Sequence, residues 1–351
     1  MRFKRRIIWV TRWDYKKPGD VKKIIQNCSE YGINTVLFQV RGNGTAYYKS
    51  QYEPWAWELS GKDSSTLGKD PGWDPLETAI KAASETDMEL HAYLNVYPGW
   101  RGKTPPPPEA KQLYTAHKNW FGLNEGGNPQ PLTDEYVTLC PGVPAVRDYL
   151  EKVFLQVVKD YPVDGIHLDY VRYYNDLGEY SLDPASIKSF KTQYHLHPLE
   201  APELWSQWKR EAVTDLVRRI SKGTKKLRKD CQVSAATWNS YYNGYSRFYQ
   251  DSWKWMKEGL LDFATPMTYT TDTKLFKLWS TLHLKYGEKT PVYPAIGVLW
   301  DEKKAGTDYF MEQMKSAQSM KADGIAIFAY DSLFPKHKAN ARAEKFVKFI
   351  S

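Results

Sequence analysis

Eight apolar runs of strand length, alternating with helical stretches, constrain the fold of this chain more than any other feature of its sequence. Strands are predicted at residues 6–11, 35–40, 89–97, 165–171, 232–238, 262–269, 291–298 and 324–330. Apolar residues at spacings of three and four predict helices at residues 20–31, 75–86, 143–160, 202–228, 249–258, 274–286, 308–321 and 340–350. Eight parallel β-α units predict an α/β protein with a closed (β/α)8 TIM barrel. An open doubly wound sheet is the alternative, but no GxGxxG motif follows the first strand.

The whole chain, residues 1–351, is predicted to form this one domain, because no change of composition marks a boundary. Apolar residues make up 42% and charged residues 26%, which is typical of a globular protein and not of a disordered chain. No segment approaches the roughly 18 uncharged apolar residues that a membrane helix requires, so the sequence excludes an integral membrane protein of that kind.

The charge balance favours an anionic partner. Lysine and arginine number 49 against 41 acidic residues, which gives a formal net charge of +8. The sequence carries no recognisable nucleic-acid-binding motif. An acidic polysaccharide or a cell-wall surface is therefore the expected partner, and nucleic acid is not.

Cys28, Cys140 and Cys231 are too few and too widely spaced for a disulfide framework or a CxxC metal site. No other group of residues has metal-ligand spacing, so we expect neither a metal nor another cofactor. The N-terminal sequence MRFKRRIIWV is basic but lacks the apolar core of a signal peptide. We therefore expect either a cytoplasmic protein or one that acts outside the cytoplasm after its signal has been removed.

Three connections are much longer than usual: residues 42–73, 98–142 and 175–201. All three leave the C-terminal end of a strand, which is where barrels carry their active sites. They are rich in Trp and Tyr, unlike disordered insertions. Since aromatic residues make up 15% of the chain, we expect ordered loops around a deep cleft that stacks flat ligands such as sugars. The alternative is that the aromatic residues only enlarge the core.

Alternation along the fourth predicted strand turns His167 and Asp169 to the same inward face, with Asp169 at the mouth of the barrel. A carboxylate is costly to bury without a partner, so Asp169 is either catalytic or part of a structural ion pair with Arg172 or His167. Asp331, after the last strand, is the candidate for a second catalytic carboxylate, with a helix cap or a loop contact as its alternative.

The same alternation selects candidate binding residues at the other strand ends: Gln39, Arg41, Asn95, His167, Arg172, Tyr173, Trp238, Tyr269, Asp272 and Trp300. No motif of a serine, cysteine or zinc hydrolase is present. Carboxylates among aromatic rings are typical of glycosidases, so the residues themselves favour glycoside hydrolysis.

Seven segments share the motifs of a known family: residues 32–41 (GINTVLFQVR), 52–61 (YEPWAWELSG), 71–76 (PGWDPL), 88–95 (MELHAYLN), 139–141 (LCP), 163–173 (VDGIHLDYVRY) and 263–269 (FATPMTY). Together they resemble the bacterial glycosyl-hydrolase-like family ten, whose members include a hydrolase of denuded peptidoglycan strands. The resemblance covers about residues 6–335. It implies a (β/α)8 barrel, a location outside the cytoplasm and hydrolysis of a hexosamine-containing polysaccharide.

The resemblance also maps individual residues. The family's strand-four aspartate corresponds to Asp169, its strand-two Gln-x-Arg to Gln39 and Arg41, and its strand-three asparagine to Asn95. Many members have a second aspartate directly after the first, where this chain has Tyr170.

Related chitinase-type barrels place a glutamate at the position of Val171. A mechanism that needs a carboxylate pair on this strand is therefore not supported. Either the acid comes from another strand or Asp169 is itself the acid.

The sequence thus predicts a glycoside hydrolase of a bacterial N-acetylhexosamine glycan, with denuded peptidoglycan strands as the first candidate. Trp238, Tyr269 and Trp300 would stack on sugar rings, and Gln39 and Asn95 would bond hydroxyl or acetamido groups. Hydrolysis of a galactosaminan or a biofilm glycan, and a non-catalytic glycan-binding barrel, are the alternatives. Two mechanisms are open. Either two carboxylates of the protein flank the scissile bond, or the substrate's own acetamide attacks the anomeric carbon and one acid of the protein suffices.

Overall fold

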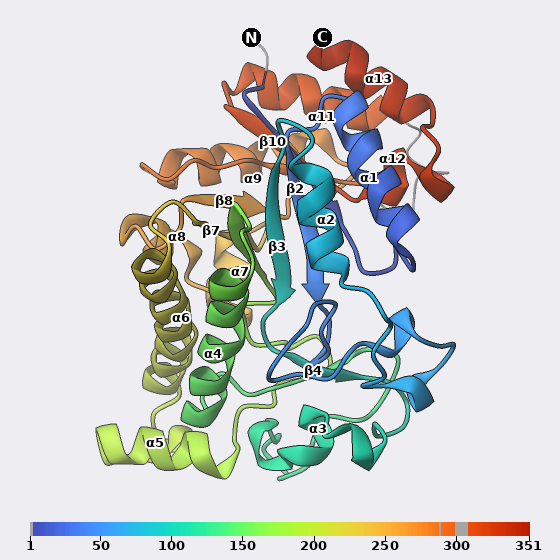
Figure 1. Cartoon of the computed structure of the whole chain (residues 1–351). Helices are drawn as coiled ribbons and strands as arrows, with labels where there is room; N and C mark the ends of the chain where they lie inside the picture. Colours follow the sequence, from blue (N-terminus) through green and yellow to red (C-terminus); the bar gives the residue numbers. More distant parts are fainter. Residues whose placement is uncertain (1–2, 288, 299–307) are drawn as a thin grey trace.

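The computed structural model describes residues 3–287, 289–298 and 308–351, which form a barrel of parallel strands inside a layer of helices (Figure 1). The strand order in the sheet is β8-β7-β6-β3-β2-β1-β10-β9. The strands are β1 (Arg5–Val10), β2 (Thr35–Arg41), β3 (Glu89–Asn95), β6 (Gly165–Asp169), β7 (Gln232–Thr237), β8 (Phe263–Pro266), β9 (Ala295–Gly297) and β10 (Gly324–Phe328). Each coincides with a predicted strand, although most are shorter than predicted.

The barrel closes between β8 and the residues just before β9. Ala264 forms a parallel bridge with Val292. The amide of Ala264 donates to the carbonyl of Pro291 (3.0 Å), and its carbonyl accepts from the amide of Tyr293 (2.9 Å). Since β1 pairs with β10 elsewhere in the ring, the strands form a nearly closed cylinder. This confirms the predicted (β/α)8 barrel.

The predicted helices all appear in the outer layer: α1 (Pro18–Glu30), α2 (Pro75–Ala83), α4 (Pro144–Asp160), α6 (Pro202–Leu227), α8 (Ser252–Lys257), α9 (Thr273–Tyr286), α11 (Asp308–Ser319) and α13 (Ala341–Ile350). Four of them, α1, α2, α4 and α6, begin with proline, whose missing N–H would have no helical acceptor at that position. Figure 1 shows α1 packed beside α2 and α4 beside α6 on the outside of the sheet.

Side chains on the two faces of the strands enter different apolar clusters. Trp9, Leu37 and Tyr93 fill the inside of the barrel. Their neighbours in the strands, such as Ile8 and Val36, face the helices and join the larger cluster. This alternation with period two is what fixes which polar side chains reach the interior and the mouth.

The long connections are ordered and contain elements that the sequence pattern does not predict. After β3 come β4 (Pro98–Arg101), β5 (Tyr136–Thr138) and the short helix α3 (Leu113–Ala116), and β4 and β5 pair antiparallel. The connection 175–201, predicted as a loop, holds α5 (Pro184–Tyr194). Two short helices, α7 (Tyr241–Arg247) and α12 (Tyr330–Leu333), follow β7 and β10.

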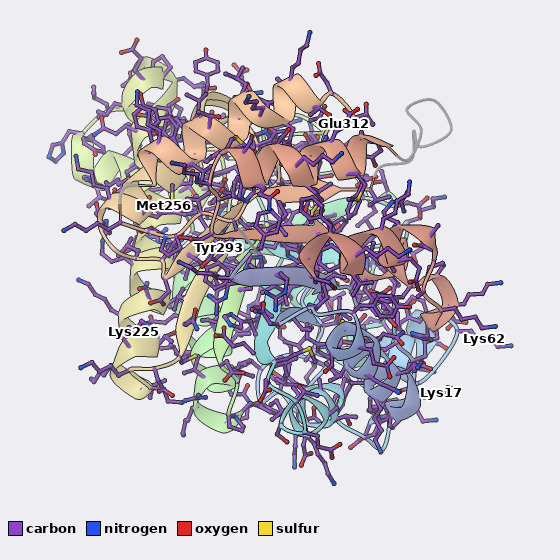
Figure 2. All side chains as sticks on the ribbon, turned by 90° about the horizontal axis from the view of Figure 1, so that it is seen from above. Lys17, Lys62, Lys225, Met256, Tyr293 and Glu312 are labelled. Carbon is purple, nitrogen blue, oxygen red and sulfur yellow. The ribbon has the colours of Figure 1, made fainter. Side chains whose placement is uncertain are left out.

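The surface carries much of the cationic surplus. Lys17 and Lys62 are exposed and point away from the barrel at its periphery (Figure 2). Cys28, Cys140 and Cys231 are free and buried. Among the helices of the described residues, none has the length and apolar character needed to cross a bilayer.

Candidate active site at the mouth of the barrel

Asp169 is the last residue of β6 and lies at the mouth with 6% of its surface exposed. The hydroxyl of Tyr93, on β3, donates to its Oδ2 (2.9 Å). The backbone N–H of Tyr170 donates to its Oδ1 (2.6 Å). Nη1 of Arg172 lies 3.7 Å from the same Oδ1. The inward orientation predicted for Asp169 therefore agrees with the structure, and the carboxylate is surrounded by donors.

Tyr170 adopts a backbone conformation that is unusual for a residue with a side chain. Its φ of +50° lies in the left-handed region, which costs a non-glycine residue about 1–2 kcal/mol. Such strain persists only where the surroundings hold it. Here the turn directs the N–H of Tyr170 at Asp169 and places its ring 4.5 Å from the guanidinium of Arg172 and 5.1 Å from the ring of Tyr136.

Asn95 and Arg172 bring unused polar atoms to Asp169. Asn95 is opposite Asp169 in the β3–β6 register and is 1% exposed, and neither its Oδ1 nor its Nδ2 has a partner among the described residues. Nε and Nη1 of Arg172 also form no hydrogen bond there. Buried polar groups are nearly always hydrogen-bonded, so these atoms mark a place for ordered water or for a ligand.

Below the mouth, His167 belongs to the barrel core. Its Nε2 accepts from Nε1 of Trp9 (3.2 Å) and its Nδ1 pairs with Oγ of Ser234 (2.9 Å). Burial lowers the pKa of His167 far below its usual value, so the ring is neutral at physiological pH. With no exposed surface and both nitrogens engaged, His167 contacts core residues, whereas the sequence predicts that it binds substrate.

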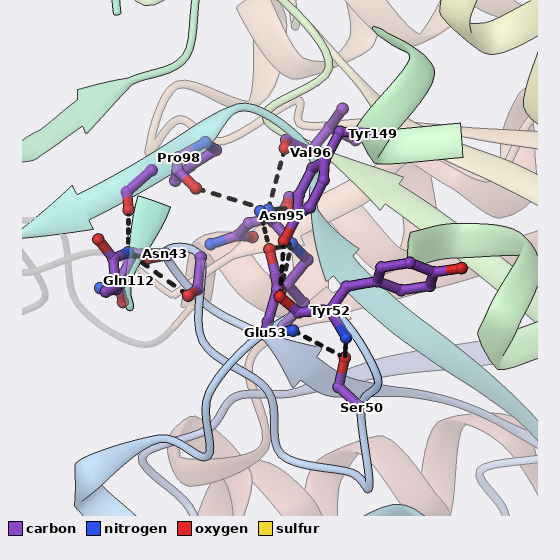
Figure 3. Close-up of polar contacts among 12 residues, drawn as sticks. Asn43, Ser50, Tyr52, Glu53, Asn95, Val96, Pro98, Gln112 and Tyr149 are labelled. Carbon is purple, nitrogen blue, oxygen red and sulfur yellow. Dashed lines mark hydrogen bonds and ion pairs between the residues drawn. The ribbon is translucent and has the colours of Figure 1, made fainter. Parts of the chain in front are cut away.

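Arg41 is fully buried and joins the loops instead of facing the mouth. Figure 3 shows the residues that it contacts, Glu53, Asn95, Val96 and Pro98, close to one another. Its Nε lies 2.9 Å and its Nη2 2.6 Å from the carboxylate of Glu53, in the loop after β2. Its Nη1 donates to the carbonyls of Asn95, Val96 (2.9 Å) and Pro98 (3.5 Å). No nitrogen of Arg41 is exposed, so the structure does not support the predicted contact between Arg41 and substrate.

Gln39 is likewise buried, and its Oε1 accepts from the backbone N–H of Arg12 (2.9 Å). The guanidinium of Arg12 lies 4.3 Å from the ring of Trp13 and donates to the hydroxyl of Tyr136 (2.9 Å). Gln39 thus stabilises the turn after β1. Arg12 packs between the rings of Trp13 and Tyr136 beside the mouth.

The remaining predicted binding residues divide between the mouth and other places. Trp238 packs 4.8 Å from the guanidinium of Arg172. Tyr269 is partly exposed beside the barrel interior. Burial raises the pKa of the Tyr269 hydroxyl, and the nearby Asp169 raises it further. Tyr173 packs against Tyr249 in the outer core, and Asp272 is the exposed N-cap of α9. Trp300 lies outside the described residues.

The predicted second carboxylate, Asp331, lies on the other side of the mouth. It is exposed in α12, which follows β10, and β10 is four strands away from β6 in the ring. Asp331 and Asp14 line a cavity of about 400 Å³. Burial, and to a lesser extent Asp331, raise the pKa of Asp14 to about 7. Asp14, which is not among the predicted site residues, thus has a perturbed carboxyl.

The deep cleft expected around Asp169 is not open in the described part of the chain. Asn95 and Arg172 keep only 1% and 5% of their surface exposed, because the rings of Tyr136, Tyr170 and Trp238 pack around the guanidinium. Residues from the connection after β3 and from the ends of β6 and β7 therefore cover the mouth closely.

A family model for glycosyl hydrolase-like 10 proteins matches residues 4–281, which include β1 to β8 and all the polar contacts of Asp169. This chain belongs to the glycosyl hydrolase-like 10 family. The resemblance seen in the sequence motifs is thereby confirmed.

Two curated members of similar sequence are bacterial. Glycosyl hydrolase DigH of Escherichia coli K12 is 26% identical over 268 residues, which are 70% of this chain and 56% of DigH. Glycosyl hydrolase YngK of Bacillus subtilis is 26% identical over 299 residues, which are 75% of this chain and 54% of YngK. The chain thus spans about half the length of the curated relatives that it matches.

Solved structures share the barrel fold of this glycosyl hydrolase-like 10 protein at low sequence identity. The PgaB (BpsB) glycoside hydrolase domain from Bordetella bronchiseptica has a TM-score of 0.66 at 14% identity and covers 99% of both chains. The β-galactosidase Gan42B from G. stearothermophilus has a TM-score of 0.66 at 13% identity, over 99% of this chain and 56% of its own. At these identities the likeness establishes the fold.

Sequence reasoning named Arg172 as a partner of Asp169 in this glycosyl hydrolase-like 10 barrel but missed the tyrosines around it. Tyr93 could have been found, because it lies two residues before Asn95 on the same inward face. Tyr170 and Tyr136 had no such signal, since a left-handed turn and a long connection bring them to the mouth. Within the described ranges, no group of three or more His, Cys, Asp or Glu residues is placed to hold a metal ion.

Proposed function

We propose that this chain hydrolyses glycosidic bonds in a bacterial polysaccharide that contains N-acetylhexosamine. The observation that carries the proposal is the carboxylate of Asp169 at the mouth of a (β/α)8 barrel, held by Tyr93 and placed among aromatic rings. Carboxylates in such surroundings are the chemistry of glycosidases. The family assignment supports the same reaction class, since DigH and YngK both carry the name glycosyl hydrolase.

Denuded peptidoglycan strands are the proposed substrate. The motifs shared with a family that includes a hydrolase of such strands support this choice. So does the net charge of +8, because the strands carry lactyl carboxylates. The proposal places the protein outside the cytoplasm, where this polymer lies.

In the proposed reaction Asp169 acts as an anion. The hydroxyl of Tyr93, the N–H of Tyr170 and the guanidinium of Arg172 all present positive charge to it, and such contacts stabilise a carboxylate. It can attack the anomeric carbon, activate water, or orient the acetamide of the substrate for attack.

A proton for the leaving group then has to come from another strand. Among the described residues, the groups that contact the Asp169 carboxylate include no second carboxyl. Asp14 and Asp331 line the cavity across the mouth. A pKa of about 7 suits Asp14 for donating a proton at neutral pH, so we propose it beside Asp331 as the acid.

The test is a panel of purified glycans, namely denuded peptidoglycan strands, a galactosaminan, a poly-N-acetylglucosamine biofilm glycan and chitin oligosaccharides, with products identified by mass spectrometry. Asp169→Asn is expected to lose at least about 10²-fold in turnover while it still binds glycan. Asp323→Asn is the matched control, because this exposed carboxylate directly precedes β10 at the opposite end of the barrel.

Cleavage of another glycan in the panel alone would correct the substrate and keep the reaction. Binding without new reducing ends from any glycan would contradict hydrolysis and identify a glycan-binding barrel. Equal loss of turnover in Asp323→Asn would show that the effect at Asp169 comes from the stability of the fold.

A further inference from the structure

Arg172 is a buried cation whose hydrogen-bonding capacity the described residues leave unused. Its side chain is 5% exposed, and Nε and Nη1 have no hydrogen-bond partner. Its one carboxylate neighbour, Asp169, lies 3.7 Å from Nη1, which is beyond hydrogen-bond distance. A guanidinium has five N–H donors, and burying it without acceptors is costly.

Aromatic rings hold this guanidinium in place. Its central carbon lies 4.5 Å from the ring centre of Tyr170, 4.8 Å from that of Trp238 and 5.9 Å from that of Phe248. Rings attract a cation through their faces but accept few hydrogen bonds. They therefore fix the orientation of Arg172 without satisfying its N–H groups.

Two other arginines near these rings do not contact Asp169. The guanidinium of Arg12 donates to the hydroxyl of Tyr136 (2.9 Å), although its Nε has no partner among the described residues, and Arg247 pairs with Asp176 (3.5 Å) at the surface. Arg172 differs from both because its unoccupied donors lie beside the carboxylate that we propose as catalytic.

We propose that Arg172 binds a carboxylate carried by the glycan, and that it makes an acidic sugar the preferred substrate. The inference rests on the proposed function. Nη1 faces Asp169, which leaves the edge that carries Nε for a ligand, and arginine binds carboxylates through two parallel N–H bonds. Because Arg172 lies next to Asp169, the acidic group belongs to the sugar ring at the cleaved bond or to its neighbour.

A carboxylate of the substrate lies close to Asp169 in this arrangement, and the two negative charges would repel each other. The guanidinium of Arg172 lies beside both and offsets that repulsion. A neutral glycan would leave the N–H groups of Arg172 without charged acceptors. Its binding free energy would therefore be less favourable than that of an acidic glycan.

The test compares denuded peptidoglycan strands with the same strands after their lactyl carboxyl groups have been reduced to alcohols. The wild type is expected to have a kcat/KM at least about 10-fold higher on the untreated strands. In Arg172→Gln this ratio should fall to about one, and Arg172→Lys, which keeps the charge but loses the fork, should lie between. Arg247→Gln is the control, because Arg247 is a cation at the exposed end of the same aromatic group. This variant should keep the wild-type ratio.

The ratio separates carboxylate binding from an effect of Arg172 on Asp169. If Arg172 only stabilised Asp169, Arg172→Gln would lower kcat/KM equally on both strands and leave the ratio unchanged, which would overturn the inference. Equal wild-type rates on both strands would overturn it too, yet leave glycan hydrolysis intact. If Arg172→Gln does not fold, Arg172→Lys, which keeps a cation among the same rings, still tests the role of Arg172 by a lower ratio than the wild type.

Loss of the proposed function is distinguishable from loss of this inference. If no strand is cleaved, hydrolysis fails, and titration calorimetry with the two strands still tests Arg172. Tighter binding of untreated strands, abolished in Arg172→Gln, would support the inference, and equal or absent binding would overturn it. A polymer that alternates N-acetylglucosamine with glucuronic acid tells whether a ring carboxylate serves as well as a lactyl one.

Discussion

At the scale of single residues, the donors around Asp169 come from one strand and one turn. The hydroxyl of Tyr93 reaches it from β3, and the N–H of Tyr170 and the guanidinium of Arg172 come from the residues that follow β6. The strand contact is the more rigid of the two kinds, because Tyr93 is packed inside the barrel.

We therefore expect Tyr93→Phe to lower kcat/KM by about 10-fold to 100-fold, because a hydrogen bond to a charged acceptor is worth about 1.5–3 kcal/mol. Steady-state kinetics on the cleaved glycan measure this. Tyr97→Phe is the control, since the hydroxyl of Tyr97 is buried without a partner in the outer core. A change in stability with unchanged kcat/KM would mean that Tyr93 has only a structural role.

Alternation along the strands was enough to place Asp169, Asn95 and Tyr269 near the mouth, because period two fixes a face once the strand is known. It could not tell how deep each residue lies. His167 shares the face of Asp169 but is one step lower and belongs to the core. Arg41 ends its strand, yet its guanidinium is turned to the loops by Glu53, an acid in the connection that follows the strand.

At the scale of elements, two buried side chains connect the long loops after β2 and β3. Arg41 joins Glu53 to the carbonyls at the end of β3. Gln112 donates to the carbonyls of Asn43 (3.0 Å) and Gly99. Figure 3 shows Glu53 and Gln112, one from each group, in the same region of the loops. Since Arg41 also contacts the carbonyl of Asn95, this connection positions a residue of the candidate site.

Arg41→Met and Glu53→Leu are each expected to lower the free energy of unfolding by about 3–5 kcal/mol, because each leaves a buried charge without its partner. The double variant Arg41→Met/Glu53→Leu should recover part of that loss, since no lone charge remains. Urea denaturation of all four proteins gives the coupling between the two sites. Additive losses would contradict a buried ion pair.

The sequence predicts the elements of the barrel well, because each strand and each main helix has its own apolar pattern. It fails for α5, α7 and the β4–β5 pair. The helix α7 and the strands β4 and β5 are short, and packing on the barrel rim decides their conformation. The helix α5 is longer, but it buries only Ser186 and Phe190, so its apolar pattern is weak. The covered mouth follows from the same loops, so it could not be predicted either.

At the scale of the whole molecule, three buried histidines make stability sensitive to acid. Burial lowers the pKa of His91 to about 3, with Arg5 adding to the effect, and that of His283 to about 4. Burial lowers the pKa of His167 even more strongly. All three stay neutral in the folded protein, whereas in the unfolded chain they gain protons below pH about 6.5.

Stability should therefore be fully present above pH about 6.5 and fall as the pH drops towards the folded-state pKa values. The expected slope between pH about 6 and 4.5 is about 1.4 kcal/mol per pH unit for each histidine, or about 4 kcal/mol for the three. Urea denaturation at several pH values measures this slope. His283→Gln should reduce it by about one third, while His195→Gln, at an exposed residue, should leave it unchanged.

The ring of strands joins the beginning of the chain to its end, since β1 pairs with β10. The segment shared with the family stops at residue 281, before β9 and β10. A protein cut there would contain every donor to the Asp169 carboxylate but would expose the free edges of β1 and β8, and unpaired edges invite aggregation. During synthesis β1 therefore stays unpaired on this edge until β10 has left the ribosome, and for that time the exposed edge can pair with other chains.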